Sequence, residues 1–236
     1  MLEEYLRYIQ NIRHLGANTV EGYTRDLEAF TSFLSANGLD PEAVTAKIAR
    51  SYIASLSMED RSAATINRAL SALRGYYRFL GKHGSTLSNP FTAIASLKKG
   101  GKLPEVLFES EVETIIETQS EHSRGDEFLT SRDRLILELL YSTGCRISEV
   151  TGIDITDLSV RDGNVLVQGK GGKDRMVPIG DRAIQWVQKY LYEVRPRLVL
   201  FPDQGTLFLT GQGESFNQDS LTALVRDYVK RSACGK

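Results

Sequence analysis

Three charged residues in the second half of the chain have the types and the setting that anion chemistry needs. Arg146 and Glu149 follow Gly144 at the end of an apolar stretch, residues 135–141, that is typical of a buried helix. Lys170 lies in a glycine-rich turn between two segments that read as the strands of a β-hairpin. An arginine where rigid structure ends and a lysine at a hairpin tip could together hold one anion.

Each of these features also has an ordinary structural explanation. An Arg-x-x-Glu pair is commonly a surface ion pair that contributes a few tenths of a kcal/mol. A lysine in a glycine-rich turn often reflects only the positive φ that the turn needs and its solubility. Taken one at a time, these residues do not decide between chemistry and surface structure.

The elements that would position these residues are mostly helices. Apolar residues recur at helical spacing in two groups of segments, at 2–14, 18–37, 45–56 and 62–80, and at 110–119, 131–143, 146–151, 181–192 and 217–230. Asn18 is predicted to cap the second of these helices. The hairpin pairs 164–168 with 176–179, and a short strand at 207–209 is expected to join it. The predicted fold class is mainly α with a small β-hairpin or sheet (α+β).

A flexible, basic segment divides the chain. Residues 98–104 are rich in lysine and glycine and are predicted to link a helical domain, 1–97, to a second domain, 105–236. Up to Pro104 the chain has 13 Lys and Arg against 9 Asp and Glu, and beyond it 16 against 21. The net charge of −1 therefore hides a mild basic bias in the first half, which permits nucleic-acid binding without demonstrating it.

Several classes of protein are disfavoured. The glycine-rich turn matches neither a nucleotide phosphate loop nor a dinucleotide-binding fingerprint, so no nucleotide cofactor is expected. His14, His83 and His122 have no metal-ligand spacing, and Cys145 and Cys234 form no disulfide framework, so we expect no metal and reduced thiols. No apolar run could span a bilayer and the first residues are acidic, so we expect a cytoplasmic protein.

A polar row follows one face of the helix at 62–80. Asn67, Arg68, Ser71, Arg74 and Arg78 supply donors that could lie along a DNA backbone or groove. The helix at 18–37 also has a polar face that could meet phosphates. A solvated face of a helical bundle explains the same pattern equally well.

The wider sequence resembles the tyrosine recombinases, in particular the Xer branch that resolves chromosome dimers. The resemblance rests on residues 139–150, 157–158 and 167–180 of the second half, and on 18–23 and 67–74 of the first. It implies a helical, SAM-like core-binding domain over 1–97 and a recombinase catalytic domain after the linker. It also implies duplex DNA as the partner and a synapse of four identical or different protomers for the complete protein.

The resemblance implies a role for each matching residue. Arg146 would contact the non-bridging oxygens of the scissile phosphate, Glu149 would brace that site, and Lys170 would protonate the departing 5′-hydroxyl. The residues expected to contact DNA are Thr19, Tyr23, Arg25, Asn67, Arg68, Ser71, Arg74, Arg78, Lys173 and Arg175.

The chain departs from the family pattern at its carboxyl end. The family's nucleophile is a late tyrosine preceded by His-x-x-Arg, but this sequence has no His-x-x-Arg and no histidine after His122. Its last tyrosine, Tyr228, falls in the apolar stripe of a helix and is predicted to be a packing residue. We therefore expect a truncated recombinase polypeptide that binds DNA without cleaving it. The alternatives are a non-catalytic DNA-binding protein derived from a recombinase and a helical adaptor that binds protein.

Overall fold

A computed structural model describes residues 1–84, 88–98, 100, 106–118, 125–169, 172–200, 202–232 and 234. The chain forms two compact units, Met1–Leu103 and Pro104–Lys236, and each unit has its own hydrophobic core. Lys170 and most of the predicted linker lie outside the described residues. Among the described helices, none combines the length and the apolar character that a membrane span requires.

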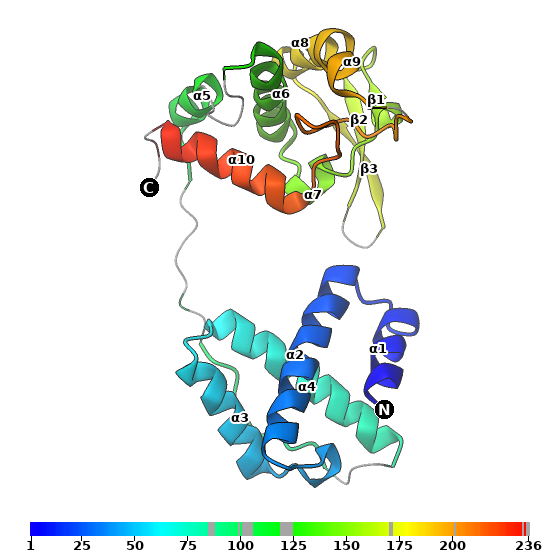
Figure 1. The fold of residues 1–236 in the computed structure, drawn as a ribbon, viewed down its shortest axis with the longest axis vertical. Coiled ribbons are helices and arrows are strands. Elements are labelled where there is room, and N and C mark those ends of the chain that lie inside the picture. The colour runs from blue at the N-terminus through cyan, green and yellow to red at the C-terminus, as the bar shows by residue number, and fades with distance from the viewer. Residues whose placement is uncertain are drawn as a thin grey trace. The chain divides into compact units, whose positions relative to one another are not determined.

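The first unit is a bundle of four helices around an aromatic core. α2 crosses α4, with α1 packed on one flank of the pair and α3 on the other (Figure 1). Phe30, Tyr52, Tyr77 and Phe91 meet edge to face or tilted at the centre, with ring centroids 4.8 to 6.2 Å apart. The helices are α1 (Leu2–Asn11), α2 (Ala17–Ala36), α3 (Ala46–Met58) and α4 (Ala63–Lys82), with a 3₁₀ turn at Pro41–Ala43.

The amino-terminal caps of these helices are residues that the sequence analysis did not assign. Ser62 and Thr45 cap α4 and α3 by accepting a hydrogen bond from the backbone N–H three residues on. The predicted cap at Asn18 is wrong, because α2 begins at Ala17 and Asn18 lies inside its first turn. Gly16 is the cap, and its carbonyl accepts the first helical hydrogen bonds.

The second unit is built around helix α6, whose side chains Leu135, Ile136 and Leu139 are fully buried. The helices α5, α7 and α8 pack directly on it. The helices of the second unit are α5 (Glu109–Glu117), α6 (Glu127–Thr143), α7 (Ile147–Val150), α8 (Asp181–Lys189), α9 (Arg195–Leu198) and α10 (Gln218–Arg231). A π-helical segment covers Tyr190–Val194, and a 3₁₀ turn covers Ile155–Asp157.

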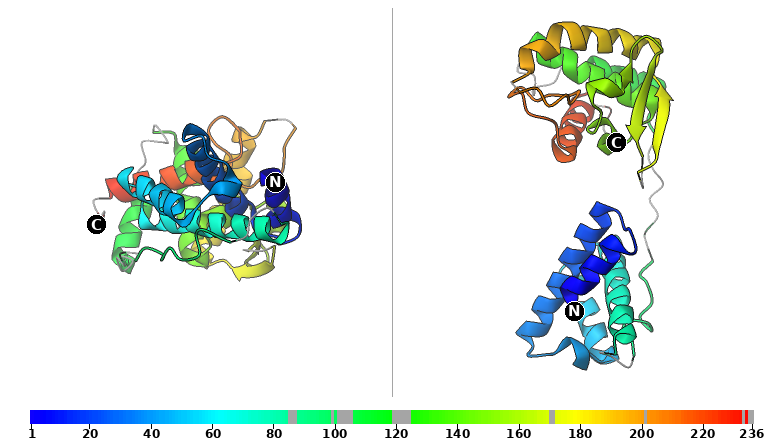
Figure 2. Two further views of the ribbon diagram at one scale, coloured as in Figure 1. Left: turned by 90° about the horizontal axis from the view of Figure 1, so that it is seen from below. Right: turned by 90° about the vertical axis from the view of Figure 1, so that its right-hand side faces the viewer.

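A three-stranded antiparallel sheet, in the order β1-β2-β3, lies along one side of these helices (Figures 1 and 2). It comprises β1 (Leu158–Ser159), β2 (Asn164–Gln168) and β3 (Asp174–Pro178). In β2, Val165 and Val167 are buried in the core, since alternate residues of a strand point to the same face. The predicted strand at 207–209 does not join this sheet, because within the described residues its only β partner is Ser215, paired with Leu209.

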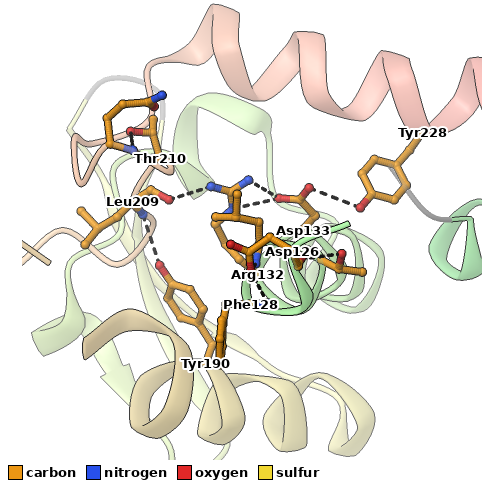
Figure 3. A network of polar contacts seen from close by, with 11 residues as sticks. Asp126, Phe128, Arg132, Asp133, Tyr190, Leu209, Thr210 and Tyr228 are labelled. Atoms are coloured by element: carbon orange, nitrogen blue, oxygen red, sulfur yellow. Dashed lines mark hydrogen bonds and ion pairs between the residues drawn. The ribbon is translucent and has the colours of Figure 1, made fainter. Parts of the chain in front are cut away.

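A buried polar network joins α6 to α10 (Figure 3). Arg132 donates to the carboxylate of Asp133 and to the carbonyl of Leu209, and Tyr228 donates to the other carboxylate oxygen at 3.3 Å. Tyr228 is 1% exposed, which confirms that it is a packing residue. The network fixes α10 and the loop before it on the central helix.

Candidate functional site

The end of α6 fixes where the candidate catalytic residues begin. Gly144 takes the left-handed conformation, φ +61°, and its N–H donates to the carbonyl of Leu140 at 3.0 Å. A glycine favours this conformation because it has no Cβ to clash. The chain then turns through buried Cys145, and Arg146 opens the short helix α7. A rigid, fully packed helix therefore sets the position of Arg146.

Glu149 gathers two arginines at the start of α7. Its carboxylate accepts from the backbone N–H of Arg146 at 2.8 Å and from the Arg146 guanidinium at 3.1 Å. It also accepts two parallel hydrogen bonds from Arg175 of β3, at 2.8 and 2.9 Å. The Arg175 hydrogen bonds lower the pKa of Glu149 to about 2, with Arg146 contributing and burial opposing. Glu149 is therefore an ionised carboxylate, only 4% exposed, that bridges helix and sheet.

Arg146 is held and yet accessible. One of its terminal nitrogens bonds Glu149, while the side chain as a whole is 69% exposed. A planar guanidinium suits bidentate contact with phosphate or carboxylate oxygens better than an ammonium does. The hydrogen bond to Glu149 orients this guanidinium before any anion arrives, and preorganised cations stabilise charge that develops in a transition state.

The predicted hairpin forms, and Lys170 at its tip lies outside the described residues. The Gly169 N–H donates to the carbonyl of Lys173 at 2.8 Å, which closes the ladder beyond the last strand pair. A Cβ on Gly169 would sit only 2.8 Å from that same oxygen, so the close approach of the two chains requires glycine. Lys173 is exposed on the returning side of the hairpin.

A polar groove of about 410 Å³ runs between α2 and α4 of the first unit. It is lined by Asn18 and Ala64 together with five of the residues predicted to contact DNA, namely Thr19, Tyr23, Asn67, Arg68 and Ser71. The structure thus gathers residues from two distant segments of the sequence on one surface.

Within the groove, Arg68 is held by an acid that sequence reasoning missed. Its guanidinium donates to both carboxylate oxygens of Asp26, each at 2.9 Å, and Asp26 is buried. This ion pair raises the pKa of Arg68 and fixes its side chain across Gly22 of α2. The sequence did contain a signal for this pair. Asp26 lies three residues after Tyr23 and four before Phe30, so helical periodicity places an acidic side chain on the apolar stripe of α2.

Two other residues of the predicted row anchor the segment after α4. Asn67 donates to the carbonyl of Leu97 at 2.9 Å and accepts from its N–H at 2.8 Å. Arg74 donates to the carbonyls of Phe91, at 3.2 Å, and of Ile94. Their hydrogen-bonding groups are therefore used to dock residues 91–97 on α4, which the helical pattern alone did not reveal.

The remaining predicted residues are not all brought together. Arg25 pairs with Glu21 at 3.3 Å, and both side chains are well exposed, which makes a weak surface ion pair. Arg78 is exposed and lines a separate cavity beside α1, and Lys173 and Arg175 belong to the second unit. Within the described residues, no group of three or more His, Cys, Asp or Glu is arranged to hold a metal ion.

The fold and the site define a protein with a helical bundle unit followed by an α+β unit that presents an oriented arginine. Residues 2–84 match the phage integrase N-terminal SAM-like domain, and residues 105–234 match the phage integrase family. The chain belongs to this family, the tyrosine recombinases, and is of the Xer type.

Similar proteins cover nearly the whole chain. It is 33% identical over 228 residues to tyrosine recombinase XerD of Chlorobaculum tepidum, covering 97% of this chain and 75% of that protein. It is 36% identical over 232 residues to tyrosine recombinase XerC of Pelobacter propionicus, and the match covers 97% of this chain and 74% of that protein.

Solved structures show the same fold. XerH bound to its palindromic difH substrate matches with a TM-score of 0.72 and 20% identity, over 95% of this chain and 65% of that one. A lambda integrase dimer bound to a COC′ core site matches with a TM-score of 0.71 and 19% identity, over 98% and 77%.

Proposed function

We propose that this chain is the DNA-binding and phosphate-activating part of a site-specific DNA recombinase. The observation that carries the proposal is Arg146, whose guanidinium is oriented by buried Glu149 and still exposed to an incoming anion. In this role Arg146 contacts the non-bridging oxygens of the scissile phosphate and stabilises the charge of the transition state. Lys170 is assigned to protonate the departing 5′-hydroxyl, a task that suits a compact donor in a glycine-flanked turn.

We assign Arg175 a positioning role in place of the DNA contact expected from the sequence. Both of its terminal nitrogens already donate to Glu149. Through that carboxylate, β3 of the hairpin is tied to the residue that would bind phosphate.

The groove between α2 and α4 is the proposed surface for duplex DNA. Its lining includes the hydroxyls of Thr19 and Tyr23, the amide of Asn18 and the partly exposed guanidinium of Arg68. Groups of these kinds contact DNA phosphates and base edges. The similar solved structures with XerH and lambda integrase are complexes with DNA, which supports this assignment. Lys173 and Arg78 are exposed cations that would add further phosphate contacts.

We expect the 236-residue polypeptide to bind DNA without forming a covalent intermediate. The sequence contains no His-x-x-Arg, and the hydroxyl of Tyr228 is buried and bonded to Asp133. Because the Tyr228 hydroxyl is engaged in this buried contact, it is not placed to attack a phosphate and form a phosphotyrosyl bond. The same observation supports the alternative that the chain serves as a DNA-binding protein without catalysis.

We further propose that several copies assemble on DNA, with copies of this chain or a related recombinase as partners. Similar structures include a lambda integrase dimer on a core site and a lambda integrase tetramer on a Holliday junction. Native mass spectrometry of the protein with a short duplex measures the number of protomers. A single protomer at every protein concentration would contradict this part of the proposal.

DNA binding is tested by fluorescence anisotropy with a short labelled duplex over a range of salt concentrations. The logarithm of the binding constant should fall with the logarithm of salt at a slope of about −0.9 for each phosphate contact. Thr19→Glu places a negative charge in the groove near the start of α2, where acid does not harm the helix, and should weaken binding several-fold. Ser51→Glu on exposed α3 is the matched control.

Two results would contradict the proposal. Absent or salt-independent binding would remove the DNA-binding function and favour the protein-binding adaptor. A covalent protein–DNA adduct on a nicked duplex, seen on a denaturing gel, would show that a nucleophile is present and overturn the expectation that the polypeptide does not cleave.

A further inference from the structure

A cavity of about 280 Å³ lies within the first unit, between α1, α2 and α4. It is distinct from the polar groove, although Tyr23 and Ser71 line both. Its volume is close to the lower limit of small-molecule sites, which run from roughly 300 Å³ upwards. A ligand in it would therefore be small and would lie beside the proposed DNA surface.

The walls of the cavity are aromatic. The ring of Phe79 lies 5.3 Å from that of Tyr8 and 5.5 Å from that of Tyr5, in tilted arrangements. The imidazole of His83 packs on Phe79 with centroids 4.1 Å apart. Ring faces and edges at these distances favour a planar ring as the occupant, because aromatic pairs prefer offset and tilted contacts.

Tyr5 brings a hydroxyl to the wall of this cavity. Tyr5 is 3% exposed, lines the cavity, and makes no hydrogen bond to any residue that the structure describes. Burial raises its pKa to about 12, although nearby Arg78 and Arg13 oppose the shift. The hydroxyl lies so close to Gly75 that a Cβ there would be 2.2 Å from it. The Tyr5 hydroxyl can therefore donate a hydrogen bond to a molecule that enters the cavity.

The charge of the lining is entirely positive. Arg13, Arg78 and Lys82 line the cavity, and the lining contains no Asp or Glu. Within the part of the chain that the structure describes, none of the three cations forms an ion pair. Cations gathered without a counter-charge around a partly enclosed space attract an anion.

From these four features we propose that the cavity binds a small aromatic anion, a planar ring that carries one carboxylate or phosphate group. The ring packs against Tyr8 and Phe79, the anionic group meets Arg13 and Arg78, and the Tyr5 hydroxyl donates to the ligand. A DNA backbone supplies anions but needs no enclosed aromatic space, so the ring-binding part of the site differs from the proposed DNA surface, although Arg78 belongs to both.

The test uses the complete chain, without DNA, and benzoate as the probe. Binding is followed by ligand-observed NMR and by the shifts of the tyrosine and phenylalanine ring protons. Benzamide is the neutral analogue of nearly the same shape, and acetate is the anion without the ring. We expect benzoate to bind in the millimolar range and both analogues to bind much more weakly. Arg78→Gln should weaken benzoate binding about tenfold, because it removes a charge-assisted hydrogen bond.

Arg50→Gln is the matched control, since Arg50 is an exposed arginine of α3 that does not line the cavity. Arg13→Gln is a second variant, on the chain just after α1, in case Arg78→Gln disturbs α4. The proposal would be overturned by equal affinities for benzoate and benzamide. It would also be overturned if Arg50→Gln weakened benzoate binding as much as both cavity variants do, or if the NMR shifts were confined to the second unit. Absence of benzoate binding would do the same, and would leave the DNA-binding function untouched because the test contains no DNA.

Discussion

Replacing Arg175 by glutamine tests whether this residue positions Glu149 or contacts DNA. The substitution removes the guanidinium that donates two hydrogen bonds to the Glu149 carboxylate and leaves Arg146 as its remaining cationic partner. The ordinary pKa of glutamate, 4.5, falls to about 2 at Glu149, and the Arg175 hydrogen bonds are the largest cause. The variant should therefore move the pKa of Glu149 back towards 4.5.

The size of the stability change follows from that pKa. At about 1.4 kcal/mol per pKa unit, the whole depression is equivalent to roughly 3 kcal/mol of preference for the charged carboxylate. Solvent screens the partly exposed arginines, so we expect a loss of about 1 to 2 kcal/mol at pH 7. A depressed pKa stabilises the folded state above pH 4.5, and this stabilisation disappears as the pH falls towards 2. The variant and the parent protein should therefore differ at pH 7 and converge between pH 4.5 and 2.

The assay is urea unfolding of the second unit, followed by the fluorescence of Trp186. This is the only tryptophan in the sequence and lies in α8, so the signal reports that unit alone. Lys173→Gln on the same hairpin is the control and should leave stability nearly unchanged, because Lys173 is exposed. In DNA titrations Lys173→Gln should reduce the salt slope by about 0.9, whereas Arg175→Gln should not change it.

Two outcomes would refute the reasoning. If the pKa of Glu149, measured by carboxyl NMR, stayed at about 2 in Arg175→Gln, the arginine would not be its main partner. A salt slope reduced by about 0.9 in the same variant would show that Arg175 contacts a phosphate, as the sequence first suggested.

Two further predictions concern stability in each unit. Asp133→Ala leaves the buried Arg132 guanidinium without its carboxylate and should destabilise the second unit by about 3 kcal/mol or more in urea unfolding. Tyr228→Phe removes one hydrogen bond to Asp133 and should destabilise the unit by only about 1 kcal/mol. Equal losses of stability in the two variants would contradict the proposed network. Gly75→Ala forces a Cβ against the Tyr5 hydroxyl and should destabilise the first unit by about 1 to 3 kcal/mol in thermal unfolding followed by circular dichroism. A gain in stability, as the helix propensity of alanine alone would give, would show that Tyr5 moves away freely.

Most helices and the hairpin could be predicted because their signals are local. Apolar residues at steps of three and four located the helices to within a few residues. The two segments on either side of a glycine-rich turn located the hairpin. The cap of α2 was predicted wrongly, because Asn18 is a favoured cap type but Gly16 occupies the cap position. The segment at 207–209 has a strand-like composition, but pairing depends on a neighbour that the local sequence does not specify.

The candidate site was predictable in residue type and only partly in role. Ordered motifs singled out Arg146 and Glu149, and the structure places them in contact. The row on α4 was predicted as a single face, whereas the structure divides it among different partners. Asn67 and Arg74 anchor the segment after α4, and Arg68 pairs with Asp26.

The sequence by itself determined which residues carry charge, where the helices run and which family motifs are present, because composition and periodicity act over a few residues. Only the tertiary structure decided which charges meet. Arg175 reaches Glu149 across 26 positions, and Arg68 reaches Asp26 across 42. A guanidinium bonds whichever acceptor the packing of distant helices and strands brings within about 3 Å, and sequence spacing does not encode that distance.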